Sequence, residues 1–329
     1  MTMRNRLTEV DLRHDRRLRV LLGDFVETLA DERLCELSVN PGGHVFASFQ
    51  GEHDQRYLGD MDERRIEGFI CAVAAAKGVV IDRESDSTLS AELPKHTPWS
   101  NGRFQGAMPP ASDGHTFTVR MHAKEIYTLQ SYVDSGIMSV THFDAILDAL
   151  RSGKSILVAG GTFSGKTTLL NAILAELAEL RPLVRVVIAE DTNELQCSAR
   201  NALHLFCHGD IEMLRVVKDM MRQRPDVGVI GEVRDEAAAA YIGFLNSGHS
   251  GGMCSVHSDS IIGALSRVEG YISQGKVFVS RADIARAIDL VIVIERKKID
   301  GVDVRRISEV AYVSDGLSKT GEYVLEGVV

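Results

Sequence analysis

A glycine-rich run in the middle of the chain constrains its fold more than any other feature. The run, Gly160-Gly161-Thr162-Phe163-Ser164-Gly165-Lys166-Thr167, satisfies the pattern G-x-x-x-x-G-K-[ST] in full. A strand-like apolar run at Ser155–Ala159 precedes it, and a helix-like run at Lys166–Leu180 follows it. Glycines between a strand and a helix let backbone N–H groups point inward, and the helix adds the positive end of its dipole. The sequence therefore predicts a phosphate-binding loop.

The pattern also predicts which groups of a nucleotide the loop binds. Lys166 is expected to reach the β- and γ-phosphates, and the Thr167 hydroxyl to ligate Mg²⁺. The predicted cofactors are therefore ATP and Mg²⁺. A chance match in a glycine-rich turn is the alternative, which the agreement of strand, loop and helix disfavours. The residues expected to bind the nucleotide are Gly160, Gly161, Thr162, Phe163, Ser164, Gly165, Lys166, Thr167 and Thr168.

The patterns on the two sides of Gly136 predict two domains of different class. Residues 1–136 hold an amphipathic opening helix over Leu18–Leu29, a helix over Asp62–Lys77 and several strand-like runs, which predicts a small α+β domain. In residues 137–329 strands alternate with helices, which predicts an α/β domain with a parallel-rich sheet. The strands expected in the first domain are Cys35–Val39, His44–Phe49, Thr88–Leu93, Gly102–Met108 and Thr116–Met121.

The second domain is expected to close with a hairpin whose turn is Asp300-Gly301. Its expected helices, besides the one after the loop, are Thr141–Leu150, Asp210–Arg222 and Asp235–Asn246. Its further expected strands are Val184–Ala189, Val227–Ile230, Met253–Val256, Leu290–Glu295 and Val304–Val313.

The composition argues against several classes of protein. A net charge of −9 and a pI of about 5.7 disfavour a general nucleic-acid binder. The 5 cysteines are scattered without a C-x-x-C pair, which suits a reducing compartment and gives neither a zinc ribbon nor a disulfide framework. The charged N-terminus lacks the apolar core of a signal peptide, and no run approaches the roughly 18 apolar residues that span a bilayer. We expect a soluble cytoplasmic protein that reaches a membrane only through partners.

Two acidic positions follow predicted strands. Glu232 comes after Val227–Ile230, with Gly231 in the place where the common Walker B strand ends in an aspartate. Glu190 opens the cluster Glu190–Glu194 after another strand, and the carboxyl ends of parallel strands meet at one edge of the sheet. We predict that both carboxylates orient the attacking water and hold the metal with Thr167. The alternatives are a helix N-terminal charge for Glu232 and a loop N-cap for Glu190.

Two histidines lie in the run from Ser247 to His257. His249 and His257 are both predicted to be catalytic, as a sensor of the γ-phosphate or as a contact between subunits. A metal site is the alternative, but no third ligand of suitable spacing stands nearby. A purely structural histidine is a further reading of each.

Taken in order, these features resemble the secretion (traffic) ATPase superfamily, and the short N-terminal region resembles its VirB11 class and the conjugal-transfer ATPases within it. The matching segments are the phosphate loop, the Asp box Glu190–Glu194, the atypical Walker B Val227–Glu232 and the His box Gly248–His257. The resemblance implies a RecA-like P-loop ATPase domain behind a small α+β, PAS-like domain. It also implies a homohexameric ring at the inner membrane that works with membrane components of a secretion or conjugation machine.

The resemblance assigns roles to two arginines of the first domain. Arg103 and Arg120 lie on predicted strands, and in the family arginines of this region touch the nucleotide phosphates when the first domain closes. We therefore expect both to be catalytic, because hydrolysis needs positive charge on the γ-phosphate beyond one lysine. An arginine on a solvated strand surface is the alternative for each.

The function expected from the resemblance is ATP hydrolysis that powers conjugative DNA transfer, type IV secretion or the associated pilus. Three alternatives stay open. One is a tight-adherence or type IV pilus motor of the same superfamily. Another is a RecA-like nucleic-acid motor, which the acidic balance disfavours, and the last is an adaptor that hydrolyses ATP slowly.

Overall fold

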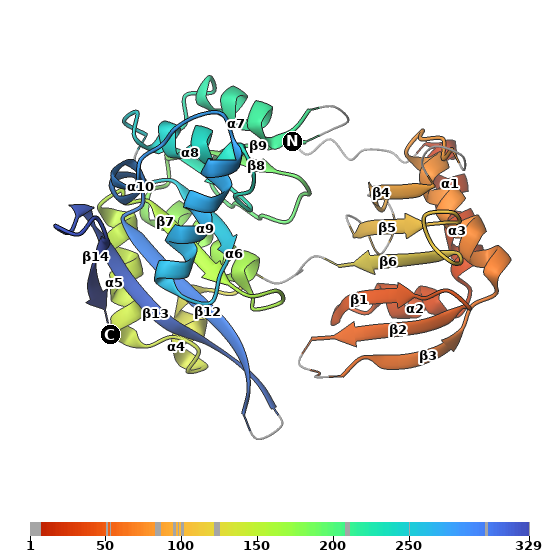
Figure 1. The fold of residues 1–329 in the computed structure, drawn as a ribbon. Helices are drawn as coiled ribbons and strands as arrows, with labels where there is room; N and C mark the ends of the chain where they lie inside the picture. Colours follow the sequence, from red (N-terminus) through yellow and green to blue (C-terminus); the bar gives the residue numbers. More distant parts are fainter. Residues whose placement is uncertain are drawn as a thin grey trace. The chain divides into compact units, whose positions relative to one another are not determined.

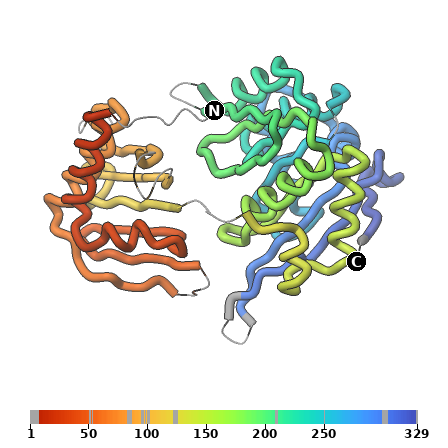
Figure 2. Tube along the Cα trace, turned by 180° about the vertical axis from the view of Figure 1, so that it is seen from behind, coloured from red at the N-terminus to blue at the C-terminus, as the bar shows by residue number. Residues whose placement is uncertain are grey.

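The computed structural model divides the chain into two compact units, Met1–Lys124 and Glu125–Val329 (Figures 1 and 2). The sequence predicted the boundary at Gly136, whereas the two compact units meet between Lys124 and Glu125. Leu129 and Tyr132 of helix α4 (Leu129–Asp134) are buried in the core of the second unit, so the segment before Gly136 belongs with that core. The structure describes residues 8–328 apart from residues 51, 53, 83–86, 95–96, 98, 100–101, 122–125, 208–210, 250 and 300–301.

The first unit is an antiparallel sheet of six strands in the order β3-β2-β1-β6-β5-β4, packed against helices. All five strands predicted here are confirmed, and the α+β class with them. The predicted opening helix is in fact two helices, because Gly23 adopts a left-handed φ of 57° and ends the first of them. The elements are α1 (Glu9–Leu22), α2 (Phe25–Ala30), β1 (Leu34–Val39), β2 (His44–Phe49), β3 (Arg56–Asp60), α3 (Glu63–Ala76), β4 (Thr88–Glu92), β5 (Arg103–Ala107) and β6 (Thr116–Arg120).

The second unit is built on a mixed sheet of eight strands in the order β14-β13-β12-β7-β11-β10-β8-β9. Neighbouring strands from β12 to β9 in this order are parallel, and β13 and β14 add antiparallel strands at one edge. The strands are β7 (Ile156–Gly160), β8 (Arg185–Glu190), β9 (Asn201–Phe206), β10 (Val227–Ile230), β11 (Met253–His257), β12 (Leu290–Ile299), β13 (Val302–Leu317) and β14 (Tyr323–Val328).

Helices cover both faces of this sheet, as its fully buried inner strands require. Helices α4, α5 and α6 contribute to the core on one face, and α7 to α10 to the core on the other. The predicted α/β class is confirmed, while the predicted turn Asp300-Gly301 lies outside the described residues. Strands β9 and β14 and helices α4, α9 and α10 were not predicted. The helices are α5 (Val140–Arg151), α6 (Lys166–Leu180), α7 (Met213–Met221), α8 (Ala237–Leu245), α9 (Ile261–Gln274) and α10 (Arg281–Ala287).

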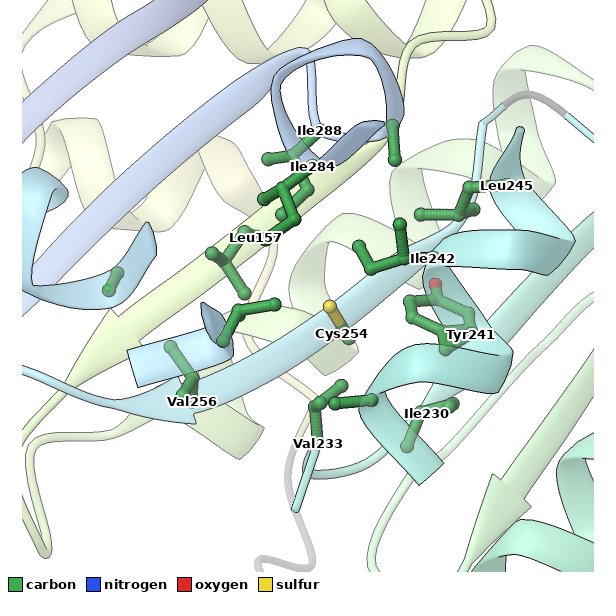
Figure 3. Packing of buried hydrophobic residues seen from close by; sticks show 14 of the residues in the cluster. Leu157, Ile230, Val233, Tyr241, Ile242, Leu245, Cys254, Val256, Ile284 and Ile288 are labelled. Atoms are coloured by element: carbon green, nitrogen blue, oxygen red, sulfur yellow. The ribbon is translucent and has the colours of Figure 1, made fainter. Parts of the chain in front are cut away.

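Helix α8 holds strands β10 and β11 at the centre of the sheet. The buried Tyr241 hydroxyl lies 3.0 Å from the carbonyl oxygens of both Gly228 and Met253, which share its single hydrogen as acceptors. Figure 3 shows Tyr241 and Ile242 of α8 beside Cys254 of β11, in the same core cluster. The strands whose carboxyl ends carry Glu232 and His257 are thereby fixed relative to one another.

Gly228 in β10 is expected to tolerate no side chain. A Cβ atom there would lie 2.6 Å from Cζ of the buried Phe244 ring, so Gly228→Ala should lower the free energy of unfolding by about 1–3 kcal/mol. Gly243 of α8 is exposed and has no atom within 4 Å of such a Cβ, so Gly243→Ala should raise it by about 0.5–1 kcal/mol. Urea denaturation of both variants measures these changes, and a Gly228→Ala protein as stable as the parent would contradict the packing.

Within the part of the chain that the structure describes, no helix is both long enough and apolar enough to cross a membrane.

Candidate active site

The glycine-rich run forms a tight loop between β7 and α6, as predicted. A Cβ atom on Gly160 would lie 2.5 Å from the carbonyl oxygen of Ile294 and closer still to Ser164 Oγ, so only glycine fits at the strand end. Gly165 precedes α6 with a left-handed φ of 103°, a conformation that glycine adopts without a steric cost. The loop therefore directs the N-terminus of α6 toward the carboxyl edge of the sheet.

Lys166, the first residue of α6, is buried beneath this loop. Its Nζ donates to the carbonyl oxygens of Gly160 at 3.0 Å and Gly161 at 2.9 Å. A third hydrogen bond of 3.1 Å joins it to Nδ1 of His257. An ammonium group has only donors, so Nδ1 of His257 must be the unprotonated nitrogen that accepts.

A chain of polar contacts runs from Lys166 across the ends of β11, β10 and β8. With Nδ1 accepting, the neutral His257 ring carries its proton on Nε2 and donates it to Glu232 Oε1 at 3.0 Å. Burial, and then the nearby charge of Lys166, lower the pKa of His257, which keeps the ring neutral at pH 7. Arg234 Nη2 contacts Glu232 Oε2 at 3.2 Å and Asp191 Oδ2 at 2.9 Å. The chain therefore orients the Glu232 carboxylate from both sides.

Glu190 lies at the end of β8 with its carboxylate buried. Oε1 accepts hydrogen bonds from the backbone N–H groups of Glu194 at 3.1 Å and Leu195 at 2.7 Å. A Cβ atom on Gly231 would lie 3.3 Å from Glu190 Cγ, so the glutamate side chain fills the space beside the strand end. This contact gives a steric reason for the glycine found where the common Walker B strand ends in a carboxylate.

The residues around the loop suit a phosphate ester with a magnesium ion. Among the described residues, neither Ser164 Oγ nor Glu190 Oε2 forms a hydrogen bond although both are buried, and His204 Nδ1 at 3.6 Å is too far from Oε2 to donate. Carboxylate and hydroxyl oxygens are the ligands that Mg²⁺ prefers, and it commonly takes one or two carboxylates together with substrate phosphates. A cluster of three His, Cys, Asp or Glu side chains, which the described chain does not contain, is not needed for such a site.

The structure brings together most of the residues predicted for catalysis in the second unit. Lys166, His257 and Glu232 form one connected network, Thr167 follows Lys166 on α6, and Glu190 lies against Gly231. Arg234 was not predicted, although its place two residues after Glu232 is a signal that could have found it. It links Asp191 of the cluster Glu190–Glu194 to Glu232.

His249 does not join this network. It precedes β11 whereas His257 ends it, so a strand of roughly 15 Å separates the two histidines. Its ring stacks on Phe244 with centroids 4.5 Å apart, and its Nδ1 lies 3.0 Å from Ser247 Oγ. The residue lines a polar cavity of about 480 Å³ at the amino ends of the strands, where no part of the phosphate loop lies.

The unequal placement of the two histidines predicts unequal effects on ATP turnover. His257→Ala should lower turnover about 10- to 100-fold, the loss typical when a residue that orients an active-site ligand is removed. His249→Ala should leave turnover within about twofold of the parent, because surface contacts away from a site contribute little. Phosphate release at saturating Mg·ATP measures both, and a larger loss from His249→Ala would contradict the placement.

Arg103 and Arg120 lie directly opposite each other on β5 and β6 of the first unit. Like charges at opposed positions of a sheet repel unless another charge compensates them. The register places Glu92 on the other side of Arg103 and Glu36 on the other side of Arg120. The two arginines are thus central members of a four-residue charged row across the sheet.

Comparisons with known proteins identify the family to which the chain is similar. A family model described as Type II/IV secretion system protein matches residues 91–302, more than half of the chain. The conjugal transfer protein TrbB of Rhizobium radiobacter is 38% identical over 299 residues, which cover 91% of this chain and 90% of the relative. The probable conjugal transfer protein TrbB of Sinorhizobium fredii is 37% identical over 302 residues, which cover 92% and 91%.

A solved structure shares the fold at lower identity. The ATPase DotB of Legionella pneumophila superposes with a TM-score of 0.63 and 18% sequence identity, over 95% of this chain and 83% of that one. The resemblance to secretion ATPases inferred from the four motifs is confirmed by the family match and by the relatives that extend along nearly the whole chain. This chain therefore belongs to the Type II/IV secretion system protein family.

Proposed function

We propose that this chain is a Mg²⁺-dependent ATP hydrolase that powers DNA transfer or pilus assembly in a conjugative type IV secretion system. The observation that carries the chemistry is the connected network of Lys166, His257 and Glu232 at the phosphate loop. The observation that favours conjugation is the 38% identity to a conjugal transfer protein over 91% of the chain. Its family membership supports both parts of the proposal.

The side chains of the second unit divide the work of hydrolysis. ATP, when bound, supplies the γ-phosphoryl group that water attacks. Mg²⁺, when bound, supplies positive charge that stabilises the phosphate oxygens during the transfer. Lys166 would exchange its bonds to Gly160 and Gly161 for bonds to phosphate oxygens, and Thr167 and Glu190 would hold the metal. Glu232, oriented by His257 and Arg234, accepts a proton from the attacking water.

Release of Lys166 from its resting contacts changes the surroundings of Glu232. Nδ1 of His257 loses the donor that fixes its tautomer in the resting arrangement. The imidazole can then take up a proton on Nδ1 and donate it to a phosphate oxygen, while Nε2–H still donates to Glu232. His257 therefore serves as the link through which the presence of a phosphate is reported to the catalytic carboxylate.

The quaternary arrangement is a further part of the proposal. We infer a homohexamer in which a RecA-like second unit hydrolyses ATP and a PAS-like first unit closes over the nucleotide with Arg103 and Arg120. The resemblance to secretion ATPases and the adjacent positions of the two arginines support this. We place the ring in the cytoplasm at the inner membrane, bound to membrane components of the machine. The net charge of −9 supports a motor without sequence-specific contacts to nucleic acid.

The test of this function is plasmid transfer from a donor strain that lacks the gene. The parent gene should restore transfer between donor and recipient, and a gene carrying Lys166→Ala should not, although the protein accumulates to the same level. The alternative function is a tight-adherence or type IV pilus motor. Adherence of the same strains to a surface, measured without recipient cells, tests this alternative. Normal transfer without the gene, together with lost adherence, would overturn the conjugative assignment.

A further inference from the structure

Arg305 of β13 lies beside the phosphate loop although it is far from it in sequence. Strand β12 pairs with β7 in parallel, with Ile294 opposite Gly160, the last residue before the loop. Strand β13 returns antiparallel to β12, with Arg305 opposite Arg296. Figure 1 shows these two strands as a long hairpin. The hairpin therefore carries Arg305 past the end of β7, to the level at which the loop begins.

The side chain of Arg305 packs against the turn that starts α6. A Cβ atom placed on Gly165 would lie 3.6 Å from Arg305 Cδ and 3.9 Å from its Nε, which is ordinary van der Waals distance. The same Cβ would lie 3.5 Å from Ile294 Cδ1, so the hairpin covers this side of the loop with an apolar and a cationic side chain. The guanidinium thus stands next to the residue that precedes Lys166.

This guanidinium has no carboxylate partner within the described part of the chain. The carboxylate of Glu295 on the neighbouring strand is already engaged by Arg306 and by Lys297, the latter at 2.8 Å. The electrostatic neighbour of Arg305 is the buried Tyr132 of α4, whose pKa is raised mainly by burial and lowered in part by the arginine. Arg305 is itself exposed, so a ligand from solvent can reach it.

A cation in this position is unfavourable unless an anion joins it. The N-terminus of α6 carries the positive end of the helix dipole. Lys166, which follows Gly165 in the chain, adds a buried ammonium group. A guanidinium presents a planar fork of donors that matches the oxygens of a phosphate group. A polyphosphate bound at the loop would supply the missing negative charge.

We propose that Arg305 binds the polyphosphate of ATP. It would be a second cation, besides Lys166, that the same protein subunit supplies. The role rests on the proposed ATP hydrolysis at this loop. Arg103 and Arg120 lie on the first unit. Arg305, in contrast, lies in the same sheet as the phosphate loop. Arg305 is therefore present in the site whatever the first unit does.

The test compares nucleotide and inorganic ligand binding in Arg305→Ala, Arg305→Lys and Arg306→Ala. The probes are ATP and inorganic tripolyphosphate, titrated by calorimetry into the full chain without Mg²⁺ so that no hydrolysis occurs. Arg305→Ala should weaken both ligands about tenfold, the loss expected for one charge-assisted hydrogen bond at an exposed site. Arg305→Lys should recover part of the affinity, because it keeps the charge but loses the fork.

Arg306→Ala is the matched control, since Arg306 is the next residue on β13 and pairs with Glu295 instead. It should bind both ligands within about twofold of the parent. Tripolyphosphate binding unchanged in Arg305→Ala would overturn the proposal, even if ATP binding fell, because the contact would then be to the base or sugar. Equal losses in Arg305→Ala and Arg306→Ala would also overturn it, as a general effect on the hairpin.

Lys166→Ala separates this proposal from the function on which it rests. If Lys166→Ala loses ATP binding while Arg305→Ala keeps it, only the role of Arg305 is wrong. If neither variant loses ATP binding, the loop is not the nucleotide site and both proposals fail. The melting temperature of each ligand-free variant should stay within about 2 °C of the parent, because exposed substitutions rarely cost much stability.

Discussion

Lys166→Ala is expected to reduce ATP turnover by on the order of 10³-fold, below the detection limit of most assays. Lys166 is the buried cation of the loop, and its Nζ already lies among backbone oxygens of Gly160 and Gly161 where a phosphate can replace them. Charge that develops on the phosphate oxygens during transfer then has no lysine to meet it. Phosphate release from purified protein at saturating Mg·ATP measures the loss.

Lys154→Ala is the matched control for this substitution. Lys154 lies just before the other end of β7, where its Nζ stands 5.0 Å from the centroid of the Tyr312 ring. Its removal should change turnover by less than about twofold, since it costs at most one cation–π contact of about 0.5–1 kcal/mol. Turnover that survives Lys166→Ala, or that falls equally in both variants, would contradict the assignment of the loop.

Glu232→Gln is expected to separate ATP binding from hydrolysis. The substitution keeps the size of the side chain and hydrogen-bonding oxygen, so ATP should bind within a few-fold of the parent. Hydrolysis should fall about 10²- to 10⁴-fold, because an amide cannot accept the proton of the attacking water. Calorimetric titration with ATP and a single-turnover assay with Mg·ATP measure the two properties in the same preparation.

Glu236→Gln serves as the control for the glutamate substitution. Glu236 is exposed and lies four positions further on, at the start of α8. Its loss of charge should leave both binding and hydrolysis close to those of the parent. If Glu232→Gln hydrolysed ATP normally, the carboxylate would have only the structural role of holding His257 and Arg234 in place.

The part of the site that could be predicted from the sequence depends on one property of parallel sheets. Glu190, Glu232 and His257 each lie at or just beyond the carboxyl end of a strand, and such ends share one edge of the sheet. The phosphate loop lies at the same edge because it follows β7. The alternation of apolar strands with helices was therefore sufficient to predict that these residues lie at the same edge of the sheet.

His249 is a residue to which this reasoning was not applied. It belongs to the same glycine-rich run as His257, but β11 begins after it, so the sheet places the two rings at opposite edges. The predicted strand Met253–Val256 already separates the two histidines, but the prediction that both are catalytic did not take this separation into account. Strand β9 was missed because it is an edge strand without a fully buried residue and lacks a strong apolar pattern.

Arg234 and Arg305 were missed because their contacts depend on register and side-chain direction. Arg234 bridges Asp191 and Glu232 only because β8 and β10 are neighbours in the sheet, which follows from topology rather than from order along the chain. Arg305 reaches the loop through two successive strand pairings, β7 with β12 and β12 with β13. The second pairing was predicted from the Asp300-Gly301 turn signal, but the pairing of β7 with β12 has no signature in the sequence around Arg305.

The most direct test of the whole account is steady-state phosphate release by the purified chain with ATP, with and without Mg²⁺. We predict hydrolysis that requires Mg²⁺, is abolished by Lys166→Ala and Glu232→Gln, and is unaffected by Lys154→Ala. Hydrolysis by the parent that continues unchanged in Lys166→Ala would contradict the account, because the phosphate loop and its network would then not be the site of the reaction.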